Sequence, residues 1–283
     1  MTHRPTYPVT AEPIGPPTAQ PLRNRTALVT GGGRGLGRLL ATALADAGAC
    51  VAVVGRTPRP LRDTAEELES RGVRALALTA DLTAPETVRR AVEQVIGEFG
   101  ALDILVNNAG VGGPVGPFWS TGEPDWRRAL DVNLHGTAGA CRAALPHMTA
   151  RRSGRVINIV SVAGHNRWPY ASAYSVSKAA IIKLTENLAH ELAGHGVRTF
   201  SFHPGLLDLG LTRDHLERGE TGDPWRDRIG DWLRAERDAG RFTPPERVGR
   251  ALIHLADGTA DPLTGRYLTA EDDIPALART RTA

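Results

Sequence analysis

The chain is poor in cysteine, lysine and long apolar runs, and these shortages exclude several classes of protein. Cys50 and Cys141 are too few for a disulfide framework, so the sequence predicts a cytoplasmic protein. No run of about 18 apolar residues is present, which argues against a membrane span. The 34 basic residues are scattered among 31 acidic ones, whereas nucleic-acid binding usually needs a clustered basic stripe. We therefore expect neither a membrane nor a nucleic acid as a partner.

Lysine is so scarce that its positions are informative. Of the 34 basic residues only Lys178 and Lys183 are lysine. Lys178 follows Tyr174 by four positions in a stretch with helical spacing, Ser172 to Leu192, and such residues share one helix face. An ammonium beside a phenol favours the phenolate and lowers the tyrosine pKa from about 10. The pair is a candidate for proton transfer, although an ordinary amphipathic helix can also contain it by chance.

The length and composition predict one domain with a sizeable core. The chain has 283 residues, of which 41% are hydrophobic. Residues 1–22 are rich in proline and lack apolar periodicity, so we expect a disordered tail there and a domain over residues 23–283.

A glycine-rich turn joins the first predicted strand to the first predicted helix. Residues 26–30 form a short apolar run, Gly31, Gly35 and Gly37 follow it, and helical spacing continues from Leu36 to residue 47. A strand, a glycine turn and a helix N-terminus together form a binding site for a pyrophosphate. The spacing departs from Gly-x-Gly-x-x-Gly, and Arg38 and Leu39 stand where an ATP-binding P-loop needs Lys and Ser or Thr. A dinucleotide is therefore favoured over ATP.

Further strands alternate with helices along the whole chain. The remaining strands are predicted at residues 50–54, 75–79, 102–106, 155–160, 197–202 and 265–269, and helices at 60–70, 85–99, 125–150, 172–192 and 245–256. This alternation predicts an α/β fold, a single Rossmann-type, doubly wound parallel sheet flanked by helices. Ligands then bind at the carboxyl ends of the strands, where Gly31, Arg56, Asp81 and Asn107 fall. Residues 206–242 are charged and irregular, and residues from 271 onward resemble a loosely held end.

Arginine stands where an NAD site usually has an acid. Arg56 follows the second strand and Arg34 lies in the glycine turn. Two guanidiniums suit the additional phosphate of NADP(H), so we expect NADP(H) to be preferred, with NAD(H) possible. The alternative is that both arginines are solvated surface residues. No histidine or cysteine spacing indicates a metal site.

Taken together, these motifs resemble the short-chain dehydrogenase/reductase family from about Arg25 to Leu268. The matching features are the glycine turn, Asp81, the Asn107-Asn108-Ala109-Gly110 segment, Asn133 seven residues after Trp126, Ser161 thirteen residues before Tyr174, Lys178, and Pro204-Gly205. By this resemblance Tyr174 is the general acid or base, Lys178 lowers its pKa and binds the nicotinamide ribose, Ser161 holds the substrate oxygen, and Asn133 supports a water-linked proton path. The resemblance implies cofactor contacts at Gly31, Gly33, Arg34, Gly35, Leu36, Gly37, Arg56, Asp81, Leu82, Asn108, Ala109, Gly110, Tyr174, Lys178, Pro204, Gly205 and Leu207.

Two departures from the family pattern stand out. Leu209 occupies the position of a threonine that contacts the cofactor carboxamide, and the nearest threonine is Thr212. The usual Asp-Gly-Gly end of the last strand is replaced by residues 269–273.

The expected activity is hydride transfer between nicotinamide and a carbonyl or secondary alcohol, by a ketoreductase or alcohol dehydrogenase. Trp119, Trp168, Trp225 and Trp232 fall in segments that the family uses around its pocket, which favours a bulky apolar or aromatic substrate at Ser161, Trp168 and Tyr174. Residues 206–242 are a candidate lid, and the resemblance implies a homodimer or homotetramer. An epimerase or dehydratase that uses nicotinamide transiently, and a non-catalytic nucleotide-binding regulator, remain as alternatives.

Overall fold

All strands of the sheet are parallel. The first three strands are added toward one edge of the sheet, and the fourth to seventh strands are added toward the other edge. The computed structural model describes residues 20–219 and 221–282, and its seven strands lie in the order β3-β2-β1-β4-β5-β6-β7. The strands are β1 (Thr26–Thr30), β2 (Cys50–Gly55), β3 (Ala75–Thr79), β4 (Ile104–Asn107), β5 (Gly154–Ile159), β6 (Val197–His203) and β7 (Tyr267–Thr269). The chain winds outward from β1 in one direction and from β4 in the other, which creates a crevice at their carboxyl ends. The predicted Rossmann-type fold is confirmed.

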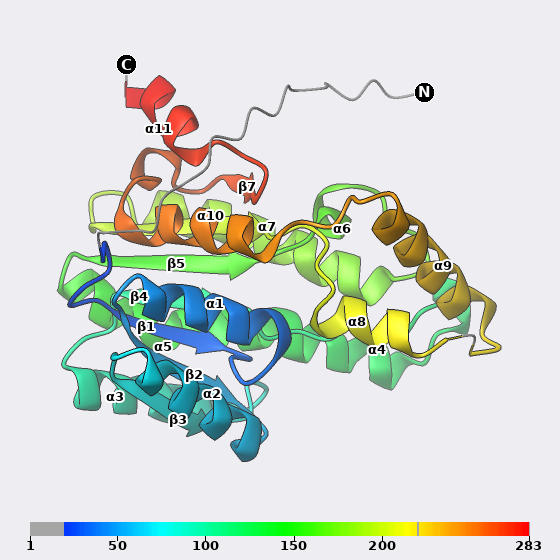
Figure 1. Ribbon diagram of the computed structural model, residues 1–283, viewed down its shortest axis with the longest axis horizontal. Helices are drawn as coiled ribbons and strands as arrows, with labels where there is room; N and C mark the ends of the chain where they lie inside the picture. Colours follow the sequence, from blue (N-terminus) through cyan, green and yellow to red (C-terminus); the bar gives the residue numbers. More distant parts are fainter. Residues whose placement is uncertain (1–19, 220, 283) are drawn as a thin grey trace.

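Helices cover both faces of the sheet (Figure 1). The helices are α1 (Gly35–Asp46), α2 (Pro58–Ser70), α3 (Pro85–Phe99), α4 (Glu123–Leu130), α5 (Gly136–Ala150), α6 (Val162–His165), α7 (Ser172–Glu191), α8 (Gly210–Glu217), α9 (Pro224–Asp238), α10 (Pro245–Asp257) and α11 (Ile274–Thr282). Short 3-10 turns cover Phe118–Ser120 and Asp261–Leu263, and a π-helical turn covers Asp131–His135 between α4 and α5. None of the helices in the described part of the chain combines the length and the apolar composition needed to cross a bilayer.

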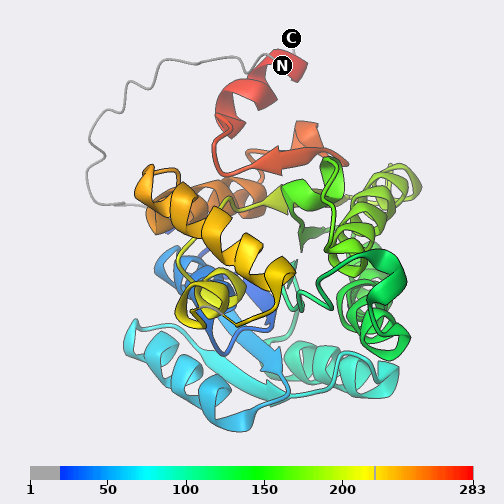
Figure 2. The ribbon, with the colours of Figure 1, turned by 90° about the vertical axis from the view of Figure 1, so that its right-hand side faces the viewer.

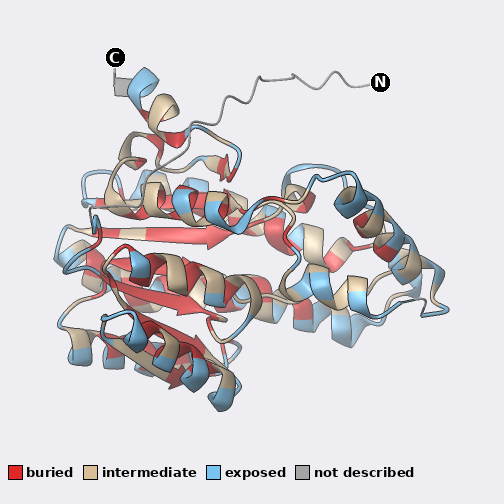
Figure 3. Ribbon diagram, viewed as in Figure 1, coloured by how far each residue is buried: buried red, intermediate tan, exposed pale blue. Residues whose placement is uncertain are grey.

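The strands form because their residues are apolar on both faces. All five residues of β1 are buried, as expected of a strand with helices on either side. One core cluster joins Phe200 to Leu40 of α1 and Leu252 of α10. A second joins Leu105 to Val92 of α3 and Met148 of α5. Figures 2 and 3 show the resulting layers, with the buried strands between helices whose outer faces are exposed.

The sequence predicts an irregular segment at residues 206–242, whereas the structure forms two helices there, α8 and α9. The Asp223 side chain caps α9 by accepting hydrogen bonds from the backbone N–H groups of Trp225 and Arg226 at 3.0 and 3.4 Å, and Pro224 occupies the first helical position. This is a well-formed helix start. Both helices lie beyond the carboxyl ends of the strands, beside α6 and α4 (Figure 1).

Both chain ends also differ from expectation. The end beginning at residue 271 is not loosely held, because α11 buries Ile274 and Ala278 against the main core. The expected tail at residues 1–22 lies outside the described residues except for its last three. Of these, Leu22 is buried and its N–H donates to the Ala47 carbonyl at 2.9 Å, so the fold begins before residue 23.

Candidate active site

The glycine turn after β1 brings two backbone segments unusually close. Gly31 and Gly35 have φ of 67° and 54°, conformations that glycine adopts without strain. A Cβ on Gly37 would lie only 2.1 Å from the Gly31 carbonyl oxygen, so α1 can begin here only with glycine at this position. The positive dipole end of α1 therefore lies at the crevice. The Gly210 backbone at the start of α8 lies against it, since a Cβ on Gly35 would be 3.0 Å from Gly210 Cα.

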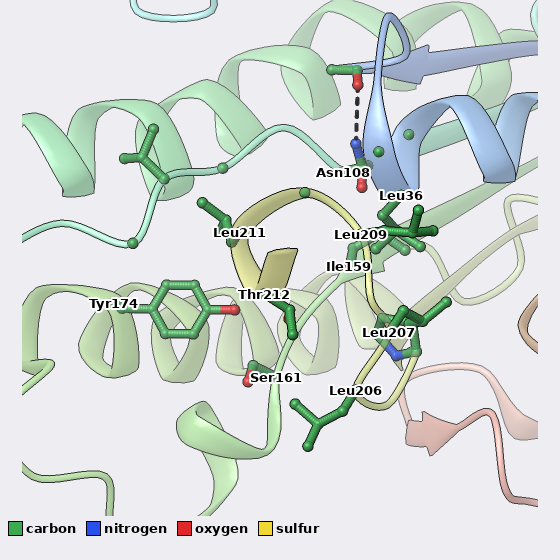
Figure 4. A pocket seen from close by; sticks show the side chains of 18 of the residues that line it. Leu36, Asn108, Ile159, Ser161, Tyr174, Leu206, Leu207, Leu209, Leu211 and Thr212 are labelled. Carbon is green, nitrogen blue, oxygen red and sulfur yellow. Dashed lines mark hydrogen bonds between the residues drawn. The ribbon is translucent and has the colours of Figure 1, made fainter. Parts of the chain in front are cut away.

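The end of β4 holds this turn in place. Thr30 Oγ1 accepts hydrogen bonds from the N–H groups of Asn108 and Ala109 at 2.9 and 3.1 Å. The Asn108 side chain donates in return to the Thr30 carbonyl at 2.9 Å (Figure 4). Asn107, in contrast, is buried in the sheet and donates to Asn158 at 2.8 Å. Only the second of the two adjacent asparagines reaches the crevice.

One cavity of about 1280 Å³ opens along the carboxyl ends of the strands. Every cofactor contact expected from the sequence lines it, and so do Ser161 and Trp168. A cavity for one drug-sized ligand occupies roughly 300–1,000 Å³, so this cavity has room for a dinucleotide and a second small molecule. Sequence reasoning passed over several lining residues on the far side of the cavity, among them Leu211, His215, Glu236, Arg241 and Glu271.

Asp81 is held as a fixed carboxylate on the cavity wall. Hydrogen bonds from the Thr83 backbone N–H and hydroxyl, at 3.0 and 2.8 Å, are the main causes that lower its pKa. The nearby positive charge of Arg56 lowers the pKa further. Asp81 is therefore ionised at neutral pH and oriented to accept hydrogen bonds from a ligand.

Tyr174, Lys178 and Ser161 meet on the cavity. Tyr174 and Lys178 lie one turn apart on α7, and Ser161 follows β5 as the N-cap of α6, its Oγ accepting from the Ala163 N–H at 3.2 Å. Burial raises the pKa of Tyr174, while a hydrogen bond with Ser161 lowers it. The Ser161 and Tyr174 side chains therefore face the same part of the cavity, where both hydroxyls can reach one substrate oxygen. Figure 4 shows the two side chains together.

The expectation of a lowered Tyr174 pKa is contradicted, because burial raises that pKa and Lys178 is not among the causes of the shift. The Lys178 ammonium donates to the Ile159 carbonyl at 2.8 Å and lies 5.7 Å from the centroid of the Tyr174 ring. Burial lowers the pKa of Lys178 itself to about 8, because the interior disfavours the charged form. In the structure, the Ser161 hydroxyl rather than the ammonium lowers the pKa of the phenol.

Asn133 lies behind the cavity rather than on it. It is fully buried in the π-helical turn, where its Oδ1 accepts from the Val111 N–H at 2.8 Å. Its Nδ2 donates to the Val111 carbonyl and to Ser177 Oγ at 2.9 and 3.0 Å. A Cβ built on Gly110 would lie 3.3 Å from Asn133 Oδ1 and 3.7 Å from Lys178 Nζ, so the amide and the ammonium flank the same glycine.

Comparison with known proteins agrees with this arrangement. A family model described as short chain dehydrogenase matches residues 25–219. The chain belongs to the short-chain dehydrogenase/reductase family. Like the other members, this protein is an oxidoreductase that uses NAD(P)(H).

Two curated relatives illustrate the range of this family. Cis-4-hydroxycyclohexanecarboxylate dehydrogenase of Sinomonas cyclohexanicum is 33% identical over 253 residues, which cover 89% of this chain and 97% of that protein. The 3-oxoacyl-(acyl-carrier-protein) reductase FabG of Aquifex aeolicus is 33% identical over 248 residues, which cover 87% of this chain and 96% of that protein.

Two solved structures of short-chain dehydrogenases/reductases superpose over most of the chain. A variant of actinorhodin polyketide ketoreductase with NADPH has a TM-score of 0.80 at 28% identity and covers 91% of this chain and 99% of its own. NAD+-bound xylitol dehydrogenase has a TM-score of 0.80 at 27% identity, with 88% and 98% covered.

The residues of this dehydrogenase/reductase fit a bound dinucleotide. The glycine turn places the α1 N-terminus on the cavity wall, next to Gly210 at the start of α8, and Asp81 is an ionised carboxylate on the same cavity. Leu209 packs beside Leu36 against the main core, and both Leu209 and Thr212 line the cavity (Figure 4). The α8 segment therefore turns a threonine toward the cavity three residues later than in the usual family pattern.

The atypical end of β7 forms its own turn. Asp272 accepts from the N–H and hydroxyl of Thr269 at 2.6 and 3.0 Å. Glu271 pairs with Arg247 on the cavity wall. The missing glycines are thus replaced by a turn that adds a charged pair to the site.

Proposed function

We propose that this enzyme is an NADP(H)-dependent oxidoreductase that interconverts a carbonyl and a secondary alcohol on a bulky apolar or aromatic small molecule. It would act as a ketoreductase or an alcohol dehydrogenase. The main support is that Tyr174, Ser161 and Lys178 line the same cavity as the glycine turn.

The proposed mechanism assigns each side chain a separate task. When bound, the nicotinamide supplies the hydride to the carbonyl carbon or accepts it from the alcohol carbon. Tyr174 donates its phenolic proton to the carbonyl oxygen in reduction and takes the alcohol proton in oxidation. Ser161 hydrogen-bonds the same oxygen and orients it. Lys178 binds the nicotinamide ribose, and Asn133 joins the wall residue Val111 to the buried Ser177 of α7.

The preference for NADP(H) is supported by the charge around the end of β2. Arg34 and Arg56 both line the cavity, and no acidic residue occurs between Gly55 and Arg62 to bind the ribose hydroxyls of NAD. Guanidinium groups bind phosphate through two parallel hydrogen bonds. We therefore assign the 2′-phosphate to these arginines.

We also infer a homodimer or homotetramer built through the helices around Asn133 and Tyr174. Phe118 and Trp119, just before α4, are 65% and 88% exposed, and Val176 on α7 is 47% exposed. Large exposed apolar side chains are typical of contact surfaces between proteins. Light scattering coupled to gel filtration tests this inference, and a monomeric mass at micromolar concentration contradicts it.

The function is tested by screening ketones for consumption of NADPH, with Tyr174→Phe as the paired variant. We expect turnover by the wild type, and in the variant unchanged NADPH binding with less than about a tenth of the turnover. Persistent turnover in Tyr174→Phe would exclude Tyr174 as the proton donor. Substrate conversion without net cofactor consumption would indicate an epimerase or dehydratase, and binding without any turnover would indicate a regulator.

A further inference from the structure

Two aromatic pairs join helix α9 to the loop between α6 and α7, and the two pairs have different surroundings. Trp232 meets Trp168, in the loop between α6 and α7, edge to face with ring centroids 5.2 Å apart. Trp225, two turns earlier on the same helix, stacks on Tyr170 of the same loop at 4.1 Å. The Arg228 guanidinium lies 5.8 Å over the Tyr170 ring. Positions 225, 228 and 232 share one face of α9, and that face meets the loop.

Only one of the two pairs belongs to the cavity. Trp168 and Trp232 both line it, with Ile229 and Leu233 beside them. Trp225 is not among the described residues that line it, and instead packs near Gly116, where a Cβ would lie 3.6 Å from Trp225 Cδ1. The outer pair therefore holds the helix, whereas the inner pair also faces whatever occupies the cavity.

The inner pair lies at the substrate end of the cavity. Trp168 precedes α7 by four residues, and Tyr174 is in the first turn of α7. Arg56 lies between β2 and α2, and Gly33 of the glycine turn lies against Pro60 of α2, whereas α9 lies beside α6 (Figure 1). Leu206 and Leu211 flank Tyr174 and Ser161 from the α8 side (Figure 4). The wall beyond the reacting groups is therefore apolar and aromatic.

Two arginine–glutamate ion pairs line the cavity. Arg241 donates two hydrogen bonds to Glu236 at 2.7 and 2.9 Å, and Arg247 pairs with Glu271. Both arginines line the cavity. A carboxylate on the substrate would have to break one of these ion pairs, and it would lose hydration on entering. This wall favours an uncharged substrate.

We propose that Trp232, held by Trp168, is a specificity-determining residue that selects an uncharged substrate whose reacting carbon belongs to a hydrocarbon ring or is attached to one. Edge-to-face packing leaves indole surface for a third group, and a ring covers more of that surface than an open chain does. The inference rests on the proposed function for the position of the reacting carbon.

The test compares three alcohols with the same hydroxyl chemistry. Cyclohexanol is an uncharged ring, 2-hexanol is an open chain with the same number of carbon atoms, and cis-4-hydroxycyclohexanecarboxylate is a charged ring. Oxidation of each with NADP+ is measured in the wild type, Trp232→Ala, Trp232→Phe and the matched control Trp225→Ala.

For the wild type we expect kcat/KM to be about five- to tenfold higher for cyclohexanol than for 2-hexanol, the range of one aromatic contact. Cyclohexanol should also exceed the carboxylate. Trp232→Ala should bring the ring and the chain to within about twofold, mainly through KM, because one aromatic contact is lost. Trp232→Phe should restore the preference. Trp225→Ala should lower both activities in parallel and leave their ratio unchanged.

Three results would overturn the proposal. They are a ring preference that survives in Trp232→Ala, an equal change of the ratio in Trp225→Ala, and a carboxylate that is the best substrate. Thermal unfolding shows whether each variant folds. If Trp232→Ala does not fold, the wild type and Trp232→Phe still give the ratio of kcat/KM for cyclohexanol and 2-hexanol. They also give the preference between cyclohexanol and the carboxylate.

A binding measurement separates this proposal from the proposed function. Cyclohexanone and 2-hexanone are titrated against the NADP+ complex and followed by tryptophan fluorescence. Suppose that no alcohol is turned over, but cyclohexanone binds more tightly than 2-hexanone and this difference depends on Trp232. The proposed function then fails, whereas the selection of a ring stands. If the two ketones bind equally, the selection fails whatever the turnover.

Discussion

Gly164 lies directly against the backbone of Lys178, the residue one helical turn after Tyr174. A Cβ at position 164 would stand 2.6 Å from the Lys178 carbonyl carbon and 2.7 Å from the Ala179 nitrogen. Helix α6 therefore rests on α7 without an intervening side chain. Because Ser161 is the N-cap of α6, this contact sets the position of the Ser161 hydroxyl relative to Tyr174.

Gly164→Ala should separate catalysis from cofactor binding. The added methyl group has backbone on its far side, so α6 must move and carry Ser161 with it. We expect kcat to fall at least about tenfold, because misplacing a catalytic group by an ångström can cost about a hundredfold, while the Kd for NADP(H) changes little. The control is Gly97→Ala on α3, where a Cβ meets nothing within 4 Å. That variant should keep full activity and gain about 1 kcal/mol of stability. Unchanged kcat in Gly164→Ala would mean that the α6 contact does not position Ser161.

Arg56→Asp should shift cofactor preference toward NAD. Loss of the guanidinium and gain of a carboxylate should raise the Kd for NADP about 10- to 100-fold, the range of one charged hydrogen bond. Binding of NAD should tighten, since an acid can hold the ribose hydroxyls. Arg59→Asp makes the same charge change at an α2 residue outside the set of described residues that line the cavity, and should alter neither Kd markedly. Calorimetric titration of both cofactors decides the matter, and tighter binding of NAD by the wild type would refute the assignment.

The pH profile should report the state of Tyr174. Burial raises the pKa of this phenol, so reduction, which needs the proton, should be level through neutral pH and decline only in the alkaline range. Oxidation needs the phenolate and should rise with pH. Ser161→Ala removes the hydrogen bond that lowers the pKa, so the pKa rises and the alkaline limb should move to higher pH. The measurement is kcat/KM against pH in both directions, and a limb that moves to lower pH would contradict the proposed contact.

Asn133→Ala should cost both stability and activity. The substitution leaves the Val111 backbone and Ser177 without their partner in a buried site. Each unsatisfied group costs about 1–3 kcal/mol, so the free energy of unfolding should fall by about 2 kcal/mol or more, with a lower kcat. Asn187→Ala, at an exposed position of α7, should change stability by less than about 0.5 kcal/mol. Urea unfolding of the two variants measures the difference, and equal effects would argue against the bridging role of Asn133.

Local patterns were sufficient for most of the sheet. Each central strand is a short apolar run followed by glycine or a polar residue. Such a run is sufficient to predict a strand that is buried on both faces. The rule that ligands bind at the carboxyl ends of parallel strands then predicted that Gly31, Arg56 and Asp81 would meet. The structure places all three on one cavity.

Helix α9 was missed because its apolar positions are few and lie between arginines and acids. Its capping by Asp223 and Pro224 is a readable start signal that was passed over. The helix α11 was missed for a related reason, since Ile274 and Ala278 become core residues only when the chain returns to the main cluster. Long-range packing decides such segments.

The order of strands and helices, the glycine turn and the spacing of Tyr174 and Lys178 were determined by the sequence itself, because each depends on neighbours within a few residues. The effect of Lys178 on the phenol, the place of Asn133 behind the cavity wall and the meeting of Trp168 with Trp232 were decided only by the tertiary structure. Electrostatic and packing interactions depend on distances between atoms, and folding sets those distances between residues far apart in the chain.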